Sequence, residues 1–159
     1  MKDKIAIIGL GYVGLPLLMN FSLNFDTVGY DNSVKRVETL KRFKDINNEF
    51  SSANLKKSLK KSIITTSFNE IKKCNYFILT IPTPIYKNKK PNLTNLNNTL
   101  KKLSTILKIN DIVIVESTVY PGYCEETAIP LVEKISGLKC NKDFISLIHV
   151  ISNRVGRIV

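Results

Sequence analysis

The first 31 residues constrain the fold more than any other part of the chain. An apolar run at residues 5–8 leads directly into three glycines, Gly9, Gly11 and Gly14, and then into a segment with helical periodicity. A second short apolar run ends in Asp31, twenty residues after Gly11. A strand, a glycine-rich turn, a helix and a second strand that ends in an acid are together typical of a dinucleotide-binding unit.

Each glycine in this turn is expected to have its own role. Gly9 permits the tight passage from strand to helix, Gly11 leaves room for a pyrophosphate, and Gly14 lets the helix lie close to the strand. The N–H groups and the dipole of the first helical turn would attract that diphosphate. Tyr12 and Val13 are expected to line the cofactor cleft, or else to serve only in packing. A glycine cluster that simply forms a turn is the alternative to the whole interpretation.

Asp31 predicts which dinucleotide is bound. Its carboxylate would accept hydrogen bonds from the hydroxyls of the adenosine ribose and repel a 2′-phosphate, which favours NAD over NADP. Lys35 and Arg36 keep an NADP alternative open, because a basic side chain can accommodate that phosphate. We therefore expect NAD as the cofactor, with Arg36 among the residues that contact it.

The composition indicates one folded domain and argues against several classes of partner. The chain has 159 residues, of which 43% are hydrophobic, enough to form a core. No apolar run approaches the ~20 residues of a membrane span. No signal-peptide pattern precedes the first strand, so a cytoplasmic location is expected. The net charge of +11 comes from lysines spread through helical segments, without a pattern of aromatic and basic residues. Neither nucleic acid nor a membrane is therefore expected as a partner.

Cysteine and histidine predict neither a metal site nor a nucleophile. Cys74, Cys124 and Cys140 lack metal-ligand spacing, and their odd number suits reduced thiols. Cys124 lies near an expected helix start, which would lower its pKa and make it the most reactive of the three. His149 stands alone in an apolar run and is expected to be buried and hydrogen-bonded rather than catalytic.

Strand-like and helix-like segments alternate along the chain. Strands are expected at residues 4–8, 27–30, 63–66, 76–81, 111–116 and 143–149, and helices at residues 13–23, 33–43, 53–61, 94–107 and 124–135. Such alternation predicts an α/β fold, a Rossmann-type, doubly wound parallel sheet with helices on both faces. Residues 82–91 and 120–122 are rich in proline or glycine and come directly after strands. They are expected on the carboxyl edge, where such sheets bind ligands.

Motifs at two of these strand ends resemble those of one family. Residues 81–84 read Ile-Pro-Thr-Pro, and residues 116–122 read Glu-Ser-Thr-Val-Tyr-Pro-Gly. With the opening GLGYVGLP and the DxxxE stretch at residues 45–49, they resemble the N-terminal NAD-binding domain of the UDP-glucose/GDP-mannose dehydrogenase family. Several stretches are similar to bacterial UDP-N-acetylhexosamine (galactosamine or glucosamine) 6-dehydrogenases. The resemblance covers residues 2–145.

The resemblance implies an enzyme that oxidises the C6 alcohol of a UDP-sugar to a carboxylate in two NAD-dependent steps, for polysaccharide biosynthesis. Pro82 and Thr83 match a turn that lies against the cofactor. Thr118 matches a catalytic threonine near the nicotinamide, where its hydroxyl would assist proton transfer. Alternatively, Thr83 and Thr118 only cap turns. A different two-domain NAD dehydrogenase, such as a 3-hydroxyacid type, is a rival that the paired motifs disfavour.

The chain departs from the family pattern after residue 145. Residues 1–145 are expected to form the NAD-binding domain, and residues 146–159 an atypical tail that suggests a frameshift or truncation. The domain that carries the family's catalytic cysteine is then missing. An inactive NAD-binding remnant, or a module that needs a separate C-terminal half, is therefore the alternative to a complete enzyme. An uncovered sheet face would favour self-association, including a homo-oligomer.

Overall fold

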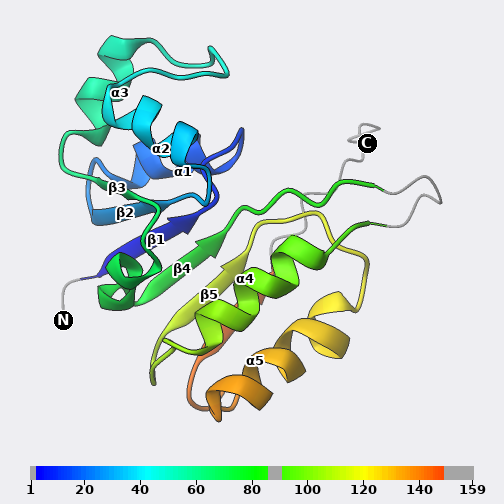
Figure 1. Cartoon of the computed structure of the whole chain (residues 1–159). Helices are drawn as coiled ribbons and strands as arrows, with labels where there is room; N and C mark the ends of the chain where they lie inside the picture. Colours follow the sequence, from blue (N-terminus) through cyan, green and yellow to red (C-terminus); the bar gives the residue numbers. More distant parts are fainter. Residues whose placement is uncertain (1–2, 86–90, 149–159) are drawn as a thin grey trace, which may run out of the picture.

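A six-stranded parallel sheet organises the protein, as seen in a computed structural model that describes residues 3–85 and 91–148 (Figure 1). The strands are β1 (Lys4–Ile8), β2 (Asp26–Tyr30), β3 (Ile63–Thr65), β4 (Tyr76–Leu79), β5 (Ile112–Val115) and β6 (Ile145–Ile148). They lie in the order β3-β2-β1-β4-β5-β6, and every pairing is parallel. This arrangement confirms the predicted Rossmann-type fold class.

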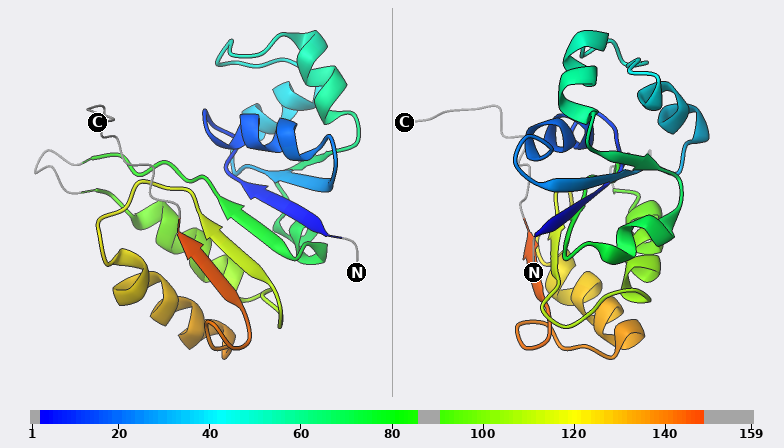
Figure 2. Two further views of the ribbon diagram at one scale, coloured as in Figure 1. Left: turned by 180° about the vertical axis from the view of Figure 1, so that it is seen from behind. Right: turned by 90° about the vertical axis from the view of Figure 1, so that its left-hand side faces the viewer.

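Helices cover both faces of the sheet (Figure 2). They are α1 (Gly14–Phe21), α2 (Val34–Lys41), α3 (Ser52–Leu59), α4 (Thr94–Ser104) and α5 (Ile129–Ser136), with the short helices η1 (Phe68–Lys73) and η2 (Cys124–Ala128). Apolar residues of α1, α2 and α3 pack with Ile5 and Ile7 of β1, whereas those of α4 and α5 share a cluster with Ala6 and Ile8. Because β1 is buried on both faces, it forms a continuous apolar run rather than an alternating one.

The strand order places a ligand-binding crevice next to β1. From β1 the chain builds outward to β2 and β3 on one side, and to β4, β5 and β6 on the other. Loops that leave the carboxyl ends of β1 and β4 therefore diverge, and the space between them is where open parallel sheets bind ligands. The glycine-rich turn after β1 and the proline-rich segment after β4 both lie at this point.

Local sequence explains where the helices begin and end. Ser33 and Ser51 precede α2 and α3, and their hydroxyl oxygens accept hydrogen bonds from the N–H groups of Arg36 and Asn54. No side chain caps the first turn of α1 in this way. Gly137 ends α5 with a φ of 74°, a left-handed conformation that glycine adopts readily, as its place after the helix predicts.

Some predicted elements differ from those observed. The single helix predicted at residues 124–135 is a π-helical turn, η2, followed by α5, because Pro130 has no N–H to donate to a preceding carbonyl. Helix η1 is an element that the sequence pattern does not predict. The strand β6 crosses the expected boundary at residue 145, and His149 lies outside the described residues. Among the helices of the described residues, none has the length and apolarity needed to cross a bilayer.

Candidate cofactor site

A pocket of about 410 Å³ opens at the carboxyl ends of β1, β2 and β4. Gly9 and Gly11 of the turn after β1 form one side of it, and Asp31 forms another directly after β2. Ile81 and Pro82, which come after β4, close it from the far side of the crevice. The pocket therefore lies at the place where the alternation of strands and helices predicts ligand binding.

The three glycines of the turn have the geometry that their predicted roles require. Gly9 has a φ of +99°, and a Cβ there would lie 2.8 Å from the Thr80 carbonyl oxygen. A Cβ on Gly14 would fall on the Gly9 carbonyl group and lie 2.5 Å from Thr80 Oγ1. A Cβ on Gly11 would meet no heavy atom within 4 Å. Gly9 and Gly14 are thus required by the protein itself, whereas Gly11 faces open space in the pocket.

Thr80 supports this turn from β4, and sequence reasoning did not identify it. Its side chain is buried, and its hydroxyl donates a hydrogen bond of 2.6 Å to the Gly9 carbonyl oxygen. A threonine at the end of an apolar strand, directly before the proline-rich segment, was the available signal. The contact fixes the distance between the turn after β1 and the end of β4.

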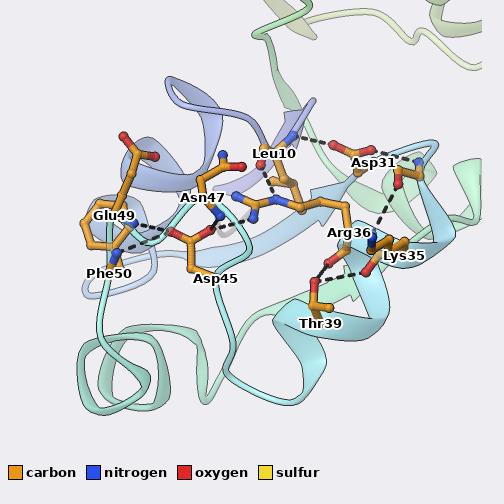
Figure 3. A network of polar contacts seen from close by, with 10 residues as sticks. Leu10, Asp31, Lys35, Arg36, Thr39, Asp45, Asn47, Glu49 and Phe50 are labelled. Atoms are coloured by element: carbon orange, nitrogen blue, oxygen red, sulfur yellow. Dashed lines mark hydrogen bonds and ion pairs between the residues drawn. The ribbon is translucent and has the colours of Figure 1, made fainter.

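Asp31 is oriented by two backbone groups (Figure 3). One carboxylate oxygen accepts the N–H of Leu10 at 2.8 Å, and the other accepts the N–H of Ser33 at 2.8 Å. Each carboxylate oxygen can accept a second hydrogen bond. The carboxylate therefore joins the glycine-rich turn to the start of α2 and still has acceptor capacity on the pocket side.

The remaining walls combine apolar and polar side chains. Tyr30 and Phe68 form an edge-to-face pair with ring centroids 5.1 Å apart, and both line the pocket. Helix α4 contributes four further lining residues, all of them polar: Asn95, Asn98, Thr99 and Lys102. Their spacing of three, four and seven residues from Asn95 places them on one helix face, so this polar wall could have been found from the sequence. Lys102 supplies a positive charge in a pocket that also holds the Asp31 carboxylate.

Tyr12, Val13 and Arg36 do not line this pocket. The side chains of Tyr12 and Val13 are exposed at the start of α1. The Arg36 side chain is buried and bonds to the carbonyl oxygen of Leu10 and to the Asp45 carboxylate. Direct contact of these three residues with a cofactor stays a prediction. Lys35, the other basic residue of the NADP alternative, is exposed.

The two motifs that come after β4 and β5 lie in contact. The hydroxyl of Thr83 donates a hydrogen bond of 2.7 Å to the carbonyl oxygen of Thr118. The backbone N–H of Ile81 donates to the buried Ser117 hydroxyl at 3.1 Å. Two segments far apart in the sequence are thereby held together beside Pro82. The structure brings Thr83 and Thr118 together, although the catalytic role of Thr118 stays a prediction.

The burial of the cysteines contradicts the prediction about their reactivity. Cys124 is fully buried, and burial raises its pKa to about 11 instead of lowering it, with a further increase from the charge of Glu125. Cys74 is also buried, and its pKa is raised to about 11 mainly for the same reason. Cys140 is half-buried. The prediction that Cys124 is the most reactive thiol is therefore wrong. Within the described residues, no cluster of three metal-ligating side chains occurs.

Comparison with known proteins shows the family to which the chain belongs. The model of the NAD binding domain of the UDP-glucose/GDP-mannose dehydrogenase family matches residues 3–153. A UDP-N-acetyl-D-glucosamine 6-dehydrogenase from Pseudomonas aeruginosa is 45% identical over 147 residues, which cover 92% of this chain and 35% of that relative. The protein CapL from Staphylococcus aureus is 39% identical over 91% of this chain and 34% of its own length.

Solved structures show the same fold. A UDP-D-ManNAc dehydrogenase from Pyrococcus horikoshii superimposes with a TM-score of 0.85 at 28% identity, covering 98% of this chain and 37% of that one. A GDP-mannose dehydrogenase from Pseudomonas aeruginosa gives a TM-score of 0.83 at 27% identity, covering 89% and 34%. The chain thus spans about a third of the length of the relatives that it matches. With a pocket at its strand ends and a family match over nearly all of its length, this chain belongs to the UDP-glucose/GDP-mannose dehydrogenase family and corresponds to its NAD binding domain.

Proposed function

We propose that this chain is the cofactor-binding part of an NAD-dependent UDP-N-acetylhexosamine 6-dehydrogenase, which oxidises the C6 alcohol of a UDP-sugar to a carboxylate. The observation that carries the proposal is the pocket in which Gly11 leaves open space and the Asp31 carboxylate lies directly after β2. The relatives named as UDP-N-acetyl-D-glucosamine 6-dehydrogenases support the substrate class. A cytoplasmic place in the synthesis of polysaccharide precursors is proposed from the same resemblance.

The residues present fit NAD. Gly11 lets a pyrophosphate approach the backbone at the uncapped start of α1, where N–H groups and the helix dipole favour negative charge. Asp31 has acceptor capacity for ribose hydroxyls, and Lys102 adds a positive charge to the pocket. Bound NAD would supply the acceptor for the hydride that leaves the sugar carbon. The protein's own contribution is to bind this group and to hold its reactive end beside Thr118.

Thr83 and Thr118 would orient the reaction from the loops after β4 and β5. The Thr83 hydroxyl fixes the Thr118 backbone through its 2.7 Å hydrogen bond to the carbonyl oxygen. The exposed side chain of Thr118 would then relay a proton between the sugar alcohol and water, since a hydroxyl can donate and accept without carrying a charge. Tyr12, Val13 and Pro82 are proposed to border the same cofactor.

A second candidate is a binding module without complete catalysis. Its support is that every role proposed for the residues lining the pocket concerns the cofactor, and none of these residues is assigned to the sugar. Hydride transfer requires that the sugar be held next to the cofactor, and such positioning supplies much of an enzyme's rate. Residues 1–145 would then bind NAD while a separate polypeptide, or a second copy of this chain in a homo-oligomer, completes the substrate site. In this second candidate, residues 146–159 would be an atypical tail to that unit.

Calorimetric titration of the purified chain with NAD⁺ and NADP⁺ tests the proposal. We expect saturable binding of NAD⁺, weaker binding of NADP⁺, and loss of both in Gly11→Val, whose side chain would occupy the open space. Lys102→Gln should weaken NAD⁺ binding, whereas Lys60→Gln removes an equal charge from the exposed end of α3 and should not. An absence of saturation with NAD⁺ would overturn the assignment.

The two candidates differ in whether this chain belongs to a polypeptide that oxidises the sugar. A UDP-N-acetylhexosamine added with NAD⁺ would yield NADH and a sugar acid if the purified chain could complete the oxidation by itself. Binding of NAD⁺ without product formation is expected of both candidates, because the first also assigns only cofactor binding to this chain. Acid formation by the purified chain alone would exclude the module.

A further inference from the structure

The segment from Asp45 to Phe50 is folded around one buried carboxylate (Figure 3). Asp45 Oδ1 accepts the N–H of Asn47 at 3.1 Å, and Oδ2 accepts the N–H groups of Glu49 and Phe50 at 3.0 and 3.3 Å. The Asp45 side chain is completely buried, whereas Glu49 is exposed. The DxxxE stretch is therefore a loop organised by its aspartate, and it lies outside the residues that line the cofactor pocket.

Arg36 joins this loop to the glycine-rich turn. Its Nη1 lies 2.6 Å from Asp45 Oδ1, and its Nε donates to the Leu10 carbonyl oxygen at 2.7 Å. The side chain of Arg36 is only 5% exposed, so neither contact is screened by solvent. A guanidinium group is planar and rigid, and therefore two contacts from one fork fix the distance and angle between their acceptors.

The backbone of Leu10 is held at both of the peptide groups that flank its Cα. Its carbonyl oxygen accepts from Arg36, and its N–H donates to Asp31 Oδ2 at 2.8 Å. Leu10 directly precedes Gly11, the residue that faces the open space of the pocket. One polar chain therefore runs from the Asp45 loop through Arg36 and Leu10 to the carboxylate proposed to bind ribose.

One nitrogen of the Arg36 guanidinium makes no hydrogen bond within the part of the chain that the structure describes. Nη2 is buried and has no hydrogen-bond partner there. Leaving a buried charged donor unpaired is unfavourable, and replacement of a whole buried ion pair such as Arg36 and Asp45 by apolar side chains of similar volume is often neutral or stabilising. The presence of an arginine at this junction with the cofactor turn indicates a role beyond stability.

We propose that Arg36 and Asp45 are positioning residues for dinucleotide binding, which couple the loop at residues 45–50 to the cofactor pocket through the Leu10 backbone. The inference rests on the proposed function, because it concerns how the same pocket is held ready for NAD. By reciprocity, a loop that stabilises the binding conformation of the turn must itself be stabilised when NAD binds.

Variants that keep the approximate size of the side chain but break these polar contacts test the effect on NAD⁺ binding. Arg36→Lys offers one ammonium group in place of a fork, and Asp45→Asn removes the charge while keeping an acceptor. We expect each to raise the Kd for NAD⁺ by about tenfold, equivalent to about 1.4 kcal/mol. The effects of Arg36→Lys and Asp31→Asn should be less than multiplicative, since both act on Leu10. Independent, multiplicative effects would overturn the inference.

A matched control is provided by Glu133, whose carboxylate pairs with Lys139 at 3.0 Å and accepts the N–H of Cys140 at 3.0 Å, away from the pocket. Glu133→Gln should leave the Kd for NAD⁺ within about twofold of the wild-type value, because its contacts share no partner with the pocket. Equal losses in Glu133→Gln and in the Arg36 and Asp45 variants would indicate general destabilisation and overturn the proposal.

Hydrogen exchange of the wild-type chain tests, without any variant, whether NAD⁺ binding stabilises the loop at residues 45–50. Saturating NAD⁺ should slow exchange of the amides of Asn47, Glu49 and Phe50 more than that of Cys140, which also donates to a carboxylate. Equal protection at both places would overturn the inference while leaving the proposed function intact. A wild-type chain that does not bind NAD⁺ at all would instead overturn the proposed function, and this inference with it.

Discussion

Two glycines of the same turn are expected to respond in opposite ways to alanine. A Cβ at Gly11 would meet no heavy atom within 4 Å, and its backbone is not in the left-handed region. A Cβ at Gly14 would fall on the Gly9 carbonyl group, 2.9 Å from its carbon and 2.5 Å from Thr80 Oγ1. Gly14→Ala must therefore displace backbone atoms, whereas Gly11→Ala requires no movement of the protein.

The expected changes in the free energy of unfolding follow from these distances. Forcing extra atoms into a packed site destabilises a protein by about 1–3 kcal/mol, and a clash with backbone lies at the upper end. For Gly14→Ala, about 3 kcal/mol would lower the Tm by about 6–12 °C in a chain of this size. Gly11→Ala instead reduces the freedom of the unfolded chain and should raise the free energy of unfolding by about 0.4–1 kcal/mol.

Binding separates the two variants further. The methyl group of Gly11→Ala would occupy the space proposed for the pyrophosphate, so we expect the Kd for NAD⁺ to rise by about tenfold or more, at least about 1.4 kcal/mol. Thermal unfolding followed by circular dichroism and calorimetric titration measure both quantities. A Gly11→Ala protein as unstable as Gly14→Ala, or one that binds NAD⁺ like the wild type, would refute this reasoning.

Three further predictions concern other parts of the chain. At about pH 8, Ellman's reagent should label Cys140 rapidly and Cys124 slowly, because burial raises the pKa of Cys124 to about 11 and leaves about one thiol in a thousand ionised; a fast phase that persists in Cys140→Ser would contradict this. Gly137→Ala should lower the free energy of unfolding in urea by about 1 kcal/mol, because its φ of +74° strains a side chain although the space is open, and Gly137→Asn, which tolerates that conformation better, should lose less. Burial alone would raise the pKa of Asp45, but hydrogen bonds from Arg36 and from backbone N–H groups hold it below its usual value. Its stabilising effect is therefore present above about pH 4 and is lost as the pH falls through the lower pKa of the folded state, so urea midpoints of the wild type should fall more on acidification than those of Asp45→Asn. Parallel midpoints would count against this pKa assignment.

Sequence periodicity was sufficient to predict the sheet because β1 is buried on both faces. A strand with apolar residues on both sides needs helices on both sides, and the alternating segments supplied them. The spacing of Gly9, Gly11 and Gly14 likewise predicted the turn, although the atoms that exclude a side chain at Gly9 and Gly14 include those of Thr80, and Gly11 faces open space. The spacing itself lies within one short segment, which is why it could be recognised without a structure.

Features that depend on distant partners were not predicted. Cys124 lies at a helix-like start, but its burial arises from packing of η2 against the sheet and α4, where Tyr123 bonds to Asn97 at 2.6 Å. Arg36 has the sequence position of a residue that could accommodate the 2′-phosphate of NADP, and its side chain forms a buried ion pair with Asp45. Neither contact can be recognised from sequence periodicity, because the partners lie 26 and 9 residues away in irregular or separate elements.

Leu10 illustrates why such contacts escape sequence reasoning and how they can still be tested. Its side chain is wholly buried among apolar neighbours, so its residue type reports only packing. Its polar contribution comes from its backbone, whose N–H donates to Asp31 and whose carbonyl oxygen accepts from Arg36. Every residue except proline has the same backbone N–H and carbonyl, and therefore substitution of Leu10 would alter the core without removing these hydrogen bonds. Only changes to the partners address the orientation of this backbone segment, which makes the paired variants at Asp31 and Arg36 the direct measure of whether the turn is held ready for a dinucleotide.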